Sequence, residues 1–392
     1  MADKIYDVII VGAGPAGSIA AKVAAEEGLE VLLIDKHEFP RDKVCGGYLS
    51  KKTLDLLKNP LDESVIEQGI FSIRLYDEQY RLHEQSFPQL VGVTVRRSEF
   101  DHYLLKQALE RGIDFKSPCK VINVGDINNK EKVKVYSDTQ VFYGKKVIAA
   151  DGVNSIMTRK CHALKRWTRW QTGFTVSTIL NTGGPPAASC KNMASFFCIP
   201  FLGGFGWAFP LKQGYNVGVG CWSHYSKVLV EFFDTFLKCF FELNSLSQTI
   251  IHPAGRYIPA GGFTRAAACG NILFAGDCAG FVDPFSGEGI YYAIRSGEIA
   301  AQEVAKSLNK DDHSAAESYT QRCRKEFNKD FKYSLFYSVI NGRKKSIATD
   351  SVKAQRMLES MAYYMYNPYV YRDILSNHIF HHPLPTTHYP LR

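Results

Sequence analysis

The sequence lacks the features that would place it outside the ordinary globular proteins. It has no low-complexity tract and no repeat at the periods typical of solenoid folds. It has no uninterrupted apolar run of about 18 residues, so we expect no segment that spans a membrane. The N-terminus, MADKIYDVIIVGAG, lacks the basic start and the cleavage site of a signal peptide. We therefore expect a cytoplasmic protein, with peripheral contact to a membrane left open.

Closely spaced cysteine pairs are also lacking. Ten cysteines are scattered through 392 residues, and no two of them have CxxC spacing. This distribution predicts reduced thiols and no disulfide framework, and it predicts no metal site. The net charge of +8 suits anionic partners, either phosphorylated ligands or an acidic membrane surface. Because the bases do not form a Lys- and Arg-rich arm, we do not expect nucleic acid as a partner.

A dinucleotide-binding pattern opens the chain. Residues 6–11 (YDVIIV) form an apolar run typical of a buried parallel strand. GAGPAG follows and places Gly12, Gly14 and Gly17 in a G-x-G-x-x-G pattern, before an Ala-rich helix and a second strand that ends at Asp35. These glycines permit a tight turn, the approach of a pyrophosphate and close helix packing, while the acid accepts hydrogen bonds from ribose hydroxyls. This context favours a Rossmann-type fold over a Gly-rich turn without a nucleotide.

Three further segments place a polar residue or a glycine at the edge of a predicted strand or helix. They contain Arg97 at a helix start, Asp151 and Gly152 after a strand, and Gly276 and Asp277 between a strand and a helix. Together with the first pattern they resemble the flavin-dependent hydroxylase superfamily of the p-hydroxybenzoate hydroxylase type, whose matching positions hold FAD. The resemblance covers most of residues 5–300. It implies FAD as the cofactor, with Asp277 bound to the ribityl chain.

The resemblance implies a set of cofactor-binding positions spread over the first three quarters of the chain. These are Gly12, Gly14, Pro15, Ala16, Gly17, Asp35, Lys36, Arg41, Cys45, Gly46, Gly47, Arg97, Val121, Asp151, Gly152, Gly276, Asp277, Gly287, Gly289 and Ile290. A helix is expected after Gly289. If its N-terminus points at the flavin, its dipole stabilises negative charge there; the alternative is a Gly-rich start that serves packing only.

Two segments resemble the geranylgeranyl reductase family, which saturates isolated double bonds in isoprenoid chains. In PRDKVCGGYLS, the residues Cys45, Gly46 and Gly47 match the CxGG-like element of the family. In FLGGFGWAFPLKQGYNVGVG, the match to the Pro-x-x-Tyr-x-Trp-x-Phe-Pro element of the lipid cavity consists of Trp207, Phe209 and Pro210. Two departures occur: Leu202 stands at the proline position and Phe205 at the tyrosine position. A Phe there removes a hydroxyl that could donate a proton.

The expected fold class is α/β (α+β overall): a Rossmann-type FAD-binding domain with an inserted antiparallel-sheet substrate domain and a C-terminal helical region. The FAD domain is expected to be discontinuous, over 1–70, 93–165 and 267–313, with the substrate domain over 71–92 and 166–266. Residues 314–392 complete the chain, and we interpret their aromatic run, AYYMYNPYVY, as a docked helix in preference to a lipid interface.

A helix in the middle of the chain carries an apolar stripe at i, i+3, i+4 spacing. We interpret the stripe as core, with the wall of an apolar pocket as the alternative. The stripe consists of Leu229, Phe232, Phe233, Phe236, Leu237 and Phe240.

The resemblance implies an FAD-dependent oxidoreductase that reduces isolated C=C bonds of a geranylgeranyl-type lipid. We expect Cys45 beside the flavin as a proton donor or a packing residue, and Trp207 and Phe205 as rings that stabilise a developing cation. Two alternatives stay open: an FAD-dependent monooxygenase of the same superfamily, and a flavin-containing lipid carrier without turnover. The electron donor is expected to be NAD(P)H or a ferredoxin, and the sequence leaves the oligomeric state open.

Overall fold

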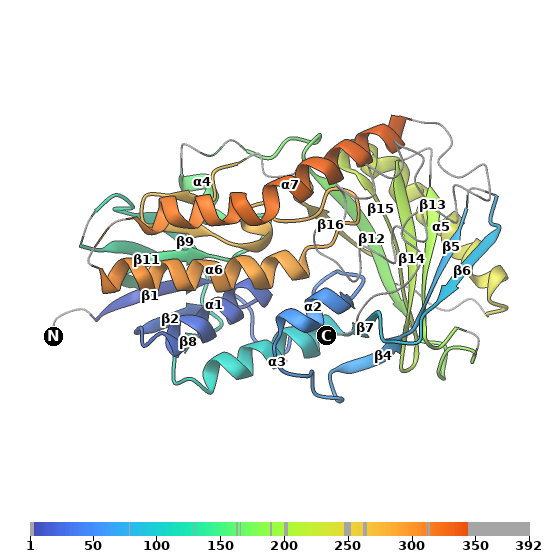
Figure 1. Cartoon of the computed structure of the whole chain (residues 1–392), viewed down its shortest axis with the longest axis horizontal. Helices are drawn as coiled ribbons and strands as arrows, with labels where there is room; N and C mark the ends of the chain where they lie inside the picture. Colours follow the sequence, from blue (N-terminus) through green and yellow to red (C-terminus); the bar gives the residue numbers. More distant parts are fainter. Residues whose placement is uncertain are drawn as a thin grey trace.

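The structure is a computed structural model of the chain. It describes residues 4–77, 79–129, 131–161, 164, 166–188, 190–199, 203–246, 252–261, 265–310, 312 and 314–343. The described residues form three sheets with helices packed on them, so the α/β class predicted from the sequence is confirmed (Figure 1).

An eight-stranded sheet forms one half of the molecule, on the left in Figure 1. Five strands are parallel in the order β18-β11-β1-β2-β8, and antiparallel strands extend the sheet. Its strands are β1 (Ile5–Val11), β2 (Val31–Ile34), β8 (Asp114–Lys116), β9 (Val121–Gly125), β10 (Val133–Ser137), β11 (Val141–Ala149), β17 (Ala268–Cys269) and β18 (Ile272–Phe274). Val8, Ile9 and Ile10 of β1 are fully buried because both faces of this strand are covered.

Helices cover this sheet. They are α1 (Pro15–Glu26), α3 (Arg97–Leu109), α4 (Ile156–Lys160), α6 (Ile290–Asn309) and α7 (Ala315–Arg343). The helix α1 packs on α3 and α6, and α6 packs on α7. A Cβ at Gly297 of α6 would overlap the carbonyl of Ala16, so this glycine allows the close crossing of α1 and α6.

A seven-stranded sheet forms the other half, on the right in Figure 1. Its order is β16 (Ala254–Ile258), β12 (Gly173–Leu180), β15 (Gly214–Trp222), β14 (Gly204–Leu211), β13 (Met193–Ile199), β5 (Ser72–Tyr76) and β6 (Leu82–Ser86). All its neighbouring strands are antiparallel except β13 and β5, which pair in parallel. Two distant parts of the chain therefore share this sheet; the division into domains at the boundaries given above stays a prediction.

The two faces of this sheet have different partners. On one face, Val217 and Val219 pack against Phe233 and Phe236 of α5 (Ser226–Leu243). The stripe of α5 thus lies in a buried core, and none of its side chains lines the main cavity, which confirms the core interpretation. The opposite face carries a second cluster that includes Trp207, and this face is turned toward the cavity described below.

A small sheet joins the two halves. It consists of β3 (Tyr48–Ser50), β7 (Gly92–Val95) and β4 (Ile66–Ile70), and α2 (Lys51–Leu56) follows β3 directly. Leu49 and Val93 of this sheet pack with Phe100 and Ile294 of the helices next to it. This sheet therefore fixes the position of the Cys45–Gly47 turn, which comes immediately before β3.

The expectation that all ten cysteines are reduced is wrong for one pair. Cys161, which follows α4, and Cys269, at the end of β17, form a disulfide. The eight other cysteines are not part of a disulfide. The two partners lie 108 positions apart in the sequence, so only the fold reveals that they are neighbours.

None of the described helices is both long enough and apolar enough to cross a bilayer.

Candidate functional site

The phosphate loop is held by contacts that only glycine permits. Gly12 adopts a φ of +102°, and a Cβ there would collide with the carbonyl oxygen of Ala150. A Cβ at Gly17 would collide in turn with the carbonyl of Gly12. The Asp35 carboxylate closes the loop by accepting hydrogen bonds from the backbone N–H of Ala13, at 2.7 Å, and of His37, at 2.9 Å.

The start of α1 is ready to receive an anion. Its N-cap residue is Gly14, and no side chain caps the helix, so the first N–H groups keep their capacity to donate. A Cβ at Gly14 would meet no backbone; its nearest neighbour would be Nη2 of Arg41, at 3.5 Å. Nε of Arg41 is buried and has no hydrogen-bond partner. Unused donors around an open position match a pyrophosphate, and FAD therefore fits here.

A buried arginine lies beside this loop. Arg97 is 6% exposed and forms two hydrogen bonds of 2.8 Å with Asp101, one turn further along α3. Burial opposes the charge on Arg97, but the Asp101 carboxylate outweighs it and keeps the pKa of Arg97 raised. The guanidinium also interacts with the thiol of Cys45. Arg97 thus brings a permanent positive charge to the cavity wall.

Asp277 faces the cavity among three bases. Nζ of Lys43 lies 3.4 Å from its Oδ2. Burial works to raise the pKa of Asp277, yet the charges of Lys43, Arg256 and Arg97 hold it below its ordinary value. Burial lowers the pKa of Lys43. Nε of Arg256 is buried without a hydrogen-bond partner, so this end of the cavity offers a carboxylate acceptor next to an unused donor.

The Asp151–Gly152 turn lies close to Arg256. Gly152 has a φ of +81°, and a Cβ there would lie 3.6 Å from Nη2 of Arg256. Oδ2 of Asp151 accepts from the N–H of Ile156, while burial raises the pKa of this carboxyl. Oδ1 of Asp151 is buried without a hydrogen-bond partner. The turn therefore contributes one free acceptor close to the cofactor end.

Reasoning from the sequence missed an ion pair at the start of α6. Glu288 lies between the two glycines that precede this helix, and its Oε2 is 2.6 Å from Nζ of Lys52, which is buried in α2. Its Oε1 accepts from Ser50, at 2.6 Å, and from Thr53, at 3.2 Å. The signal in the sequence was an acid enclosed by glycines, but its partner lies 236 positions away.

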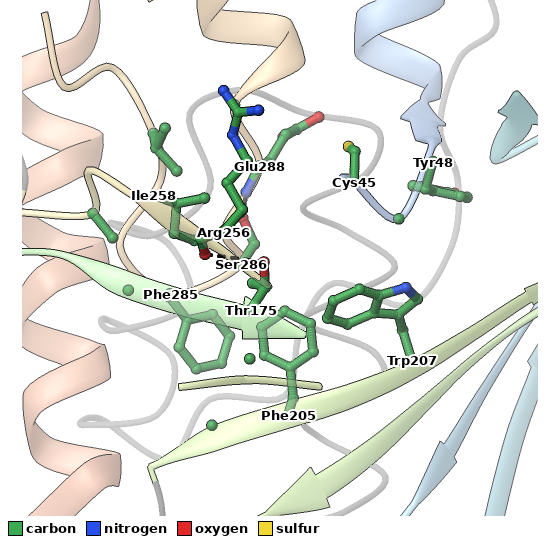
Figure 2. Close-up of a pocket in the computed structure, with 18 of the residues that line it drawn as sticks. Cys45, Tyr48, Thr175, Phe205, Trp207, Arg256, Ile258, Phe285, Ser286 and Glu288 are labelled. Carbon is green, nitrogen blue, oxygen red and sulfur yellow. Dashed lines mark hydrogen bonds between the residues drawn. The ribbon is translucent and has the colours of Figure 1, made fainter. Parts of the chain in front are cut away.

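One cavity of about 310 Å³ joins these groups to the seven-stranded sheet. Figure 2 shows the rings of Phe205 and Trp207 next to each other on the sheet side, with Cys45 on the loop that faces Trp207. A hydrogen-bond chain holds this arrangement: Nε1 of Trp207 donates to Asn216, at 3.1 Å, and Asn216 donates to the carbonyl of Cys45, at 2.8 Å.

Gly46 and Gly47 are required by the protein itself. A Cβ at Gly46 would lie 2.8 Å from the ring of Phe209 and 3.1 Å from Nε1 of Trp207. Gly47 has a φ of +71°, and its Cβ would collide with the carbonyl of Val95. The packing of the protein itself therefore explains both glycines, because protein atoms already occupy the space beside them.

The structure brings together most, but not all, of the positions expected to form the site. Those that line the cavity are Pro15, Cys45, Gly46, Gly47, Arg97, Phe205, Trp207, Asp277, Gly287, Gly289 and Ile290. The phosphate-loop residues Gly12, Gly14, Ala16 and Gly17, together with Gly276, lie directly behind it, because Gly276 is packed against Ala16.

Two expected positions lie further away. Lys36 is exposed after β2, and Val121 packs in the core of the eight-stranded sheet. Neither contributes to the cavity wall, and their cofactor contacts stay predictions. Leu202 falls outside the described residues.

Comparison with known proteins agrees with the geometry. The FAD binding domain family matches residues 5–201. A digeranylgeranylglycerophospholipid reductase from Methanocella arvoryzae is 30% identical over 372 residues, which is 89% of this chain and 91% of the relative. A menaquinone reductase from Mycolicibacterium smegmatis is also 30% identical, over 79% of this chain and 78% of the relative.

A solved structure has the same fold. The geranylgeranyl bacteriochlorophyll reductase-like protein from Thermoplasma acidophilum superposes with a TM-score of 0.79 and 22% identity, over 96% of this chain and 99% of that one. The chain therefore belongs to the FAD-binding flavoproteins and, within them, to the geranylgeranyl reductase family. The family and the cofactor predicted from the sequence are both confirmed.

Proposed function

We propose that this protein uses reduced FAD to saturate isolated C=C bonds in the chain of an isoprenoid lipid. The observation that supports this most directly is the continuity of the cavity. Arg97 and Asp277 line its cofactor end, whereas Phe196, Phe205 and Trp207 line its sheet end. A cavity with a charged end for a cofactor and an aromatic end for a ligand suits an apolar chain held against the flavin.

The chemistry of an isolated alkene explains why the aromatic end matters. Hydride attack alone would leave an unstabilised carbanion, so a proton must reach one alkene carbon before or together with the hydride at the other. Reduced FAD supplies that hydride when it is bound. Phe205 and Trp207 stabilise the positive charge that develops on the alkene through their ring faces. The apolar wall also excludes water, which would otherwise capture the cation.

Cys45 is the proposed proton donor. Its backbone is held opposite Trp207 by the Asn216 side chain, so the thiol stays at the meeting point of the two ends of the cavity. When the S–H bond breaks, the proton goes to the alkene carbon and the electron pair stays on sulfur. The backbone N–H of Gly47, which donates to the sulfur of Cys45 at 3.5 Å, is the hydrogen-bond donor next to that electron pair.

The Lys52–Glu288 pair adjusts the charge at the start of α6. The N-terminus of this helix favours negative charge at the cofactor, but an uncompensated Glu288 next to it would oppose that effect. Lys52, at 2.6 Å, offsets the charge of Glu288. We assign to Lys52 a positioning role: it holds Glu288 in place and leaves the dipole of α6 as the dominant field.

The proposed substrate class follows the name of the Methanocella relative, a digeranylgeranylglycerophospholipid reductase. The test is anaerobic incubation of the dithionite-reduced, FAD-loaded protein with digeranylgeranylglycerophospholipid in D₂O. Each newly saturated bond should gain two deuterium atoms, as read by mass spectrometry: one arrives with the hydride, because the N5 hydrogen of reduced flavin exchanges with D₂O, and the other comes from the proton donor. A lipid with saturated chains is the control. A lipid that stays unchanged under anaerobic conditions and is hydroxylated once oxygen is admitted would instead indicate a monooxygenase.

A further inference from the structure

The positive charge of the chain is concentrated in one segment. Residues 152–230 contain eight Lys and Arg residues and no Asp or Glu. The whole chain has 47 bases and 39 acids, so the remaining residues carry equal numbers of each. The net charge of +8 therefore comes entirely from this segment, which includes the loop after α4 and the start of α5. A local excess of this kind attracts anionic surfaces.

An exposed group of aromatic rings lies in the same segment. Trp170 is 62% exposed and its ring centroid lies 4.2 Å from that of His224, which in turn lies 4.1 Å from Tyr225. Tyr225 is 40% exposed, and the guanidinium of Arg169 lies 5.4 Å from the Trp170 ring centroid. Trp and Tyr rings in such positions are typical of membrane–water interfaces, where an apolar ring with a polar tip is favoured.

Exposed bases surround these rings. Arg166 and Arg169 precede Trp170, and Lys227 follows Tyr225 in the first turn of α5. Arg159 donates to the carbonyl of Asn154, which lines a second cavity together with Arg169. Within the described part of the chain, no salt bridge neutralises any of these four bases. We call the six residues Arg159, Arg166, Arg169, Trp170, Tyr225 and Lys227 the aromatic–basic surface.

This surface adjoins the main cavity. Thr172 and Ser223 belong to the second cavity, while their chain neighbours Gly173 and Trp222 line the main one. On the edge strand β16, Tyr257 faces the second cavity, and the residues on either side of it, Arg256 and Ile258, face the main cavity (Figure 2). Only the edge of the seven-stranded sheet separates the aromatic–basic surface from the proposed lipid site.

We propose that the aromatic–basic surface docks the protein on a bilayer that contains anionic lipids. Trp170 and Tyr225 enter the interface, and the four bases lie against the headgroups. A membrane is favoured over an acidic protein because the surface combines exposed rings with charge and adjoins an apolar cavity. The proposal rests on the proposed function in one respect: a substrate that resides in a membrane gives the docking its purpose.

The test is sedimentation of the full-length, FAD-loaded protein with two kinds of vesicles. One kind is phosphatidylcholine alone, and the other is phosphatidylcholine with phosphatidylglycerol in equal parts. The wild type should bind only the anionic vesicles and should be released by high salt. The fluorescence of Trp170, obtained as the difference from Trp170→Phe, should shift to the blue on binding.

Variants separate the contributions of charge and rings. Arg166→Ser with Arg169→Ser should weaken vesicle binding about 25-fold, since each base near an anionic surface contributes about fivefold. Trp170→Ala should weaken it about tenfold. The control, Arg111→Ser with Lys116→Ser, removes the same charge from exposed positions outside the segment and should change binding less than about twofold.

Each result bears on one claim only. Equal binding of wild type and surface variants, or equal binding to both vesicle types, would overturn the docking proposal while leaving alkene reduction in detergent unaffected. Vesicle binding as expected without any alkene reduction would overturn the proposed function instead. If the arginine variants keep their vesicle binding but lose electron transfer from an acidic ferredoxin, the surface belongs to a protein partner.

Discussion

The cofactor end of the cavity is walled by glycines and ion pairs, whereas the sheet end is walled by aromatic rings. At the cofactor end, Gly12 and Gly17 exclude any side chain because backbone carbonyls already occupy the space. Arg97 is buried and Asp277 is half-buried, and each lies beside an opposite charge. At the sheet end, Phe205 and Trp207 pack against other rings. A substitution at the cofactor end disturbs the backbone or leaves a charge unpaired. A substitution at the sheet end changes the shape of the cavity. The two ends should therefore respond in different measurements.

Loss of a buried charge should have the largest effect. Arg97→Met leaves the buried Asp101 without its bidentate partner and should lower the free energy of unfolding by about 3–5 kcal/mol. Urea unfolding measures it. The matched control is Arg96→Met, whose partner Glu67 lies in a more exposed pair and whose loss should cost less than about 1 kcal/mol. Equal losses for the two arginines would contradict the claim that burial makes the Arg97–Asp101 pair the more important one for stability.

Gly14 separates cofactor binding from folding. A Cβ there meets no backbone, so Gly14→Leu should leave the unfolding midpoint of the apoprotein unchanged. The side chain would instead occupy the pyrophosphate site and weaken FAD binding at least about a hundredfold. Gly184→Leu, at a position that faces open space, is the control. Retention of FAD by Gly14→Leu would count against the assignment of this loop.

Asp330 of α7 tests whether a buried carboxyl group costs stability at neutral pH. Burial, reinforced by Asp283, raises its pKa from 3.8 to about 7. The folded protein therefore keeps a proton that the unfolded chain releases, so this contribution to stability is complete below 3.8 and is lost as the pH rises through 7. Between about pH 5 and about pH 8, the free energy of unfolding should therefore fall by roughly 2 kcal/mol more in the wild type than in Asp330→Asn. An unchanged pH profile of urea unfolding would argue against a buried, protonated Asp330.

A ring at the sheet end should affect rate and not cofactor binding. Trp207→Leu removes a cation–π contact of about 2 kcal/mol and should slow single-turnover alkene reduction about thirtyfold. The FAD dissociation constant should stay within about twofold of wild type, because the cofactor end is untouched. Phe209→Leu, on the neighbouring ring, controls for packing. A Trp207 variant that reduces alkenes at the wild-type rate would show that this ring does not stabilise charge.

The cofactor end could be predicted from the sequence because its pattern is local. Gly12, Gly14, Gly17 and Asp35 fall within one strand–helix–strand unit, and the spacing of the glycines specifies the turn and the packing. The helix start at Arg97 was recognisable for the same reason, and its partner Asp101 lies only one turn away. Most of the correct predictions therefore depend on residues that lie close together in the sequence.

The rest depends on contacts between distant positions. Lys52 and Glu288 meet because α2 and α6 flank the same small sheet, and Cys161 meets Cys269 because the end of α4 lies beside β17. Asn216, which connects Trp207 to the Cys45 turn, had no local signal either. The reason for Gly46 was also hidden, because the rings that exclude a side chain there come from β14.

The central claim is that the aromatic end holds an alkene against the cofactor held by the charged end. The most direct measurement is the absorbance of reduced, FAD-loaded protein mixed anaerobically with a polyisoprenoid lipid. Flavin reoxidation should depend on the lipid concentration and should be slower in Cys45→Ala and Trp207→Leu than in the wild type. Flavin that stays reduced with every isoprenoid alkene and is reoxidised only by oxygen would contradict it.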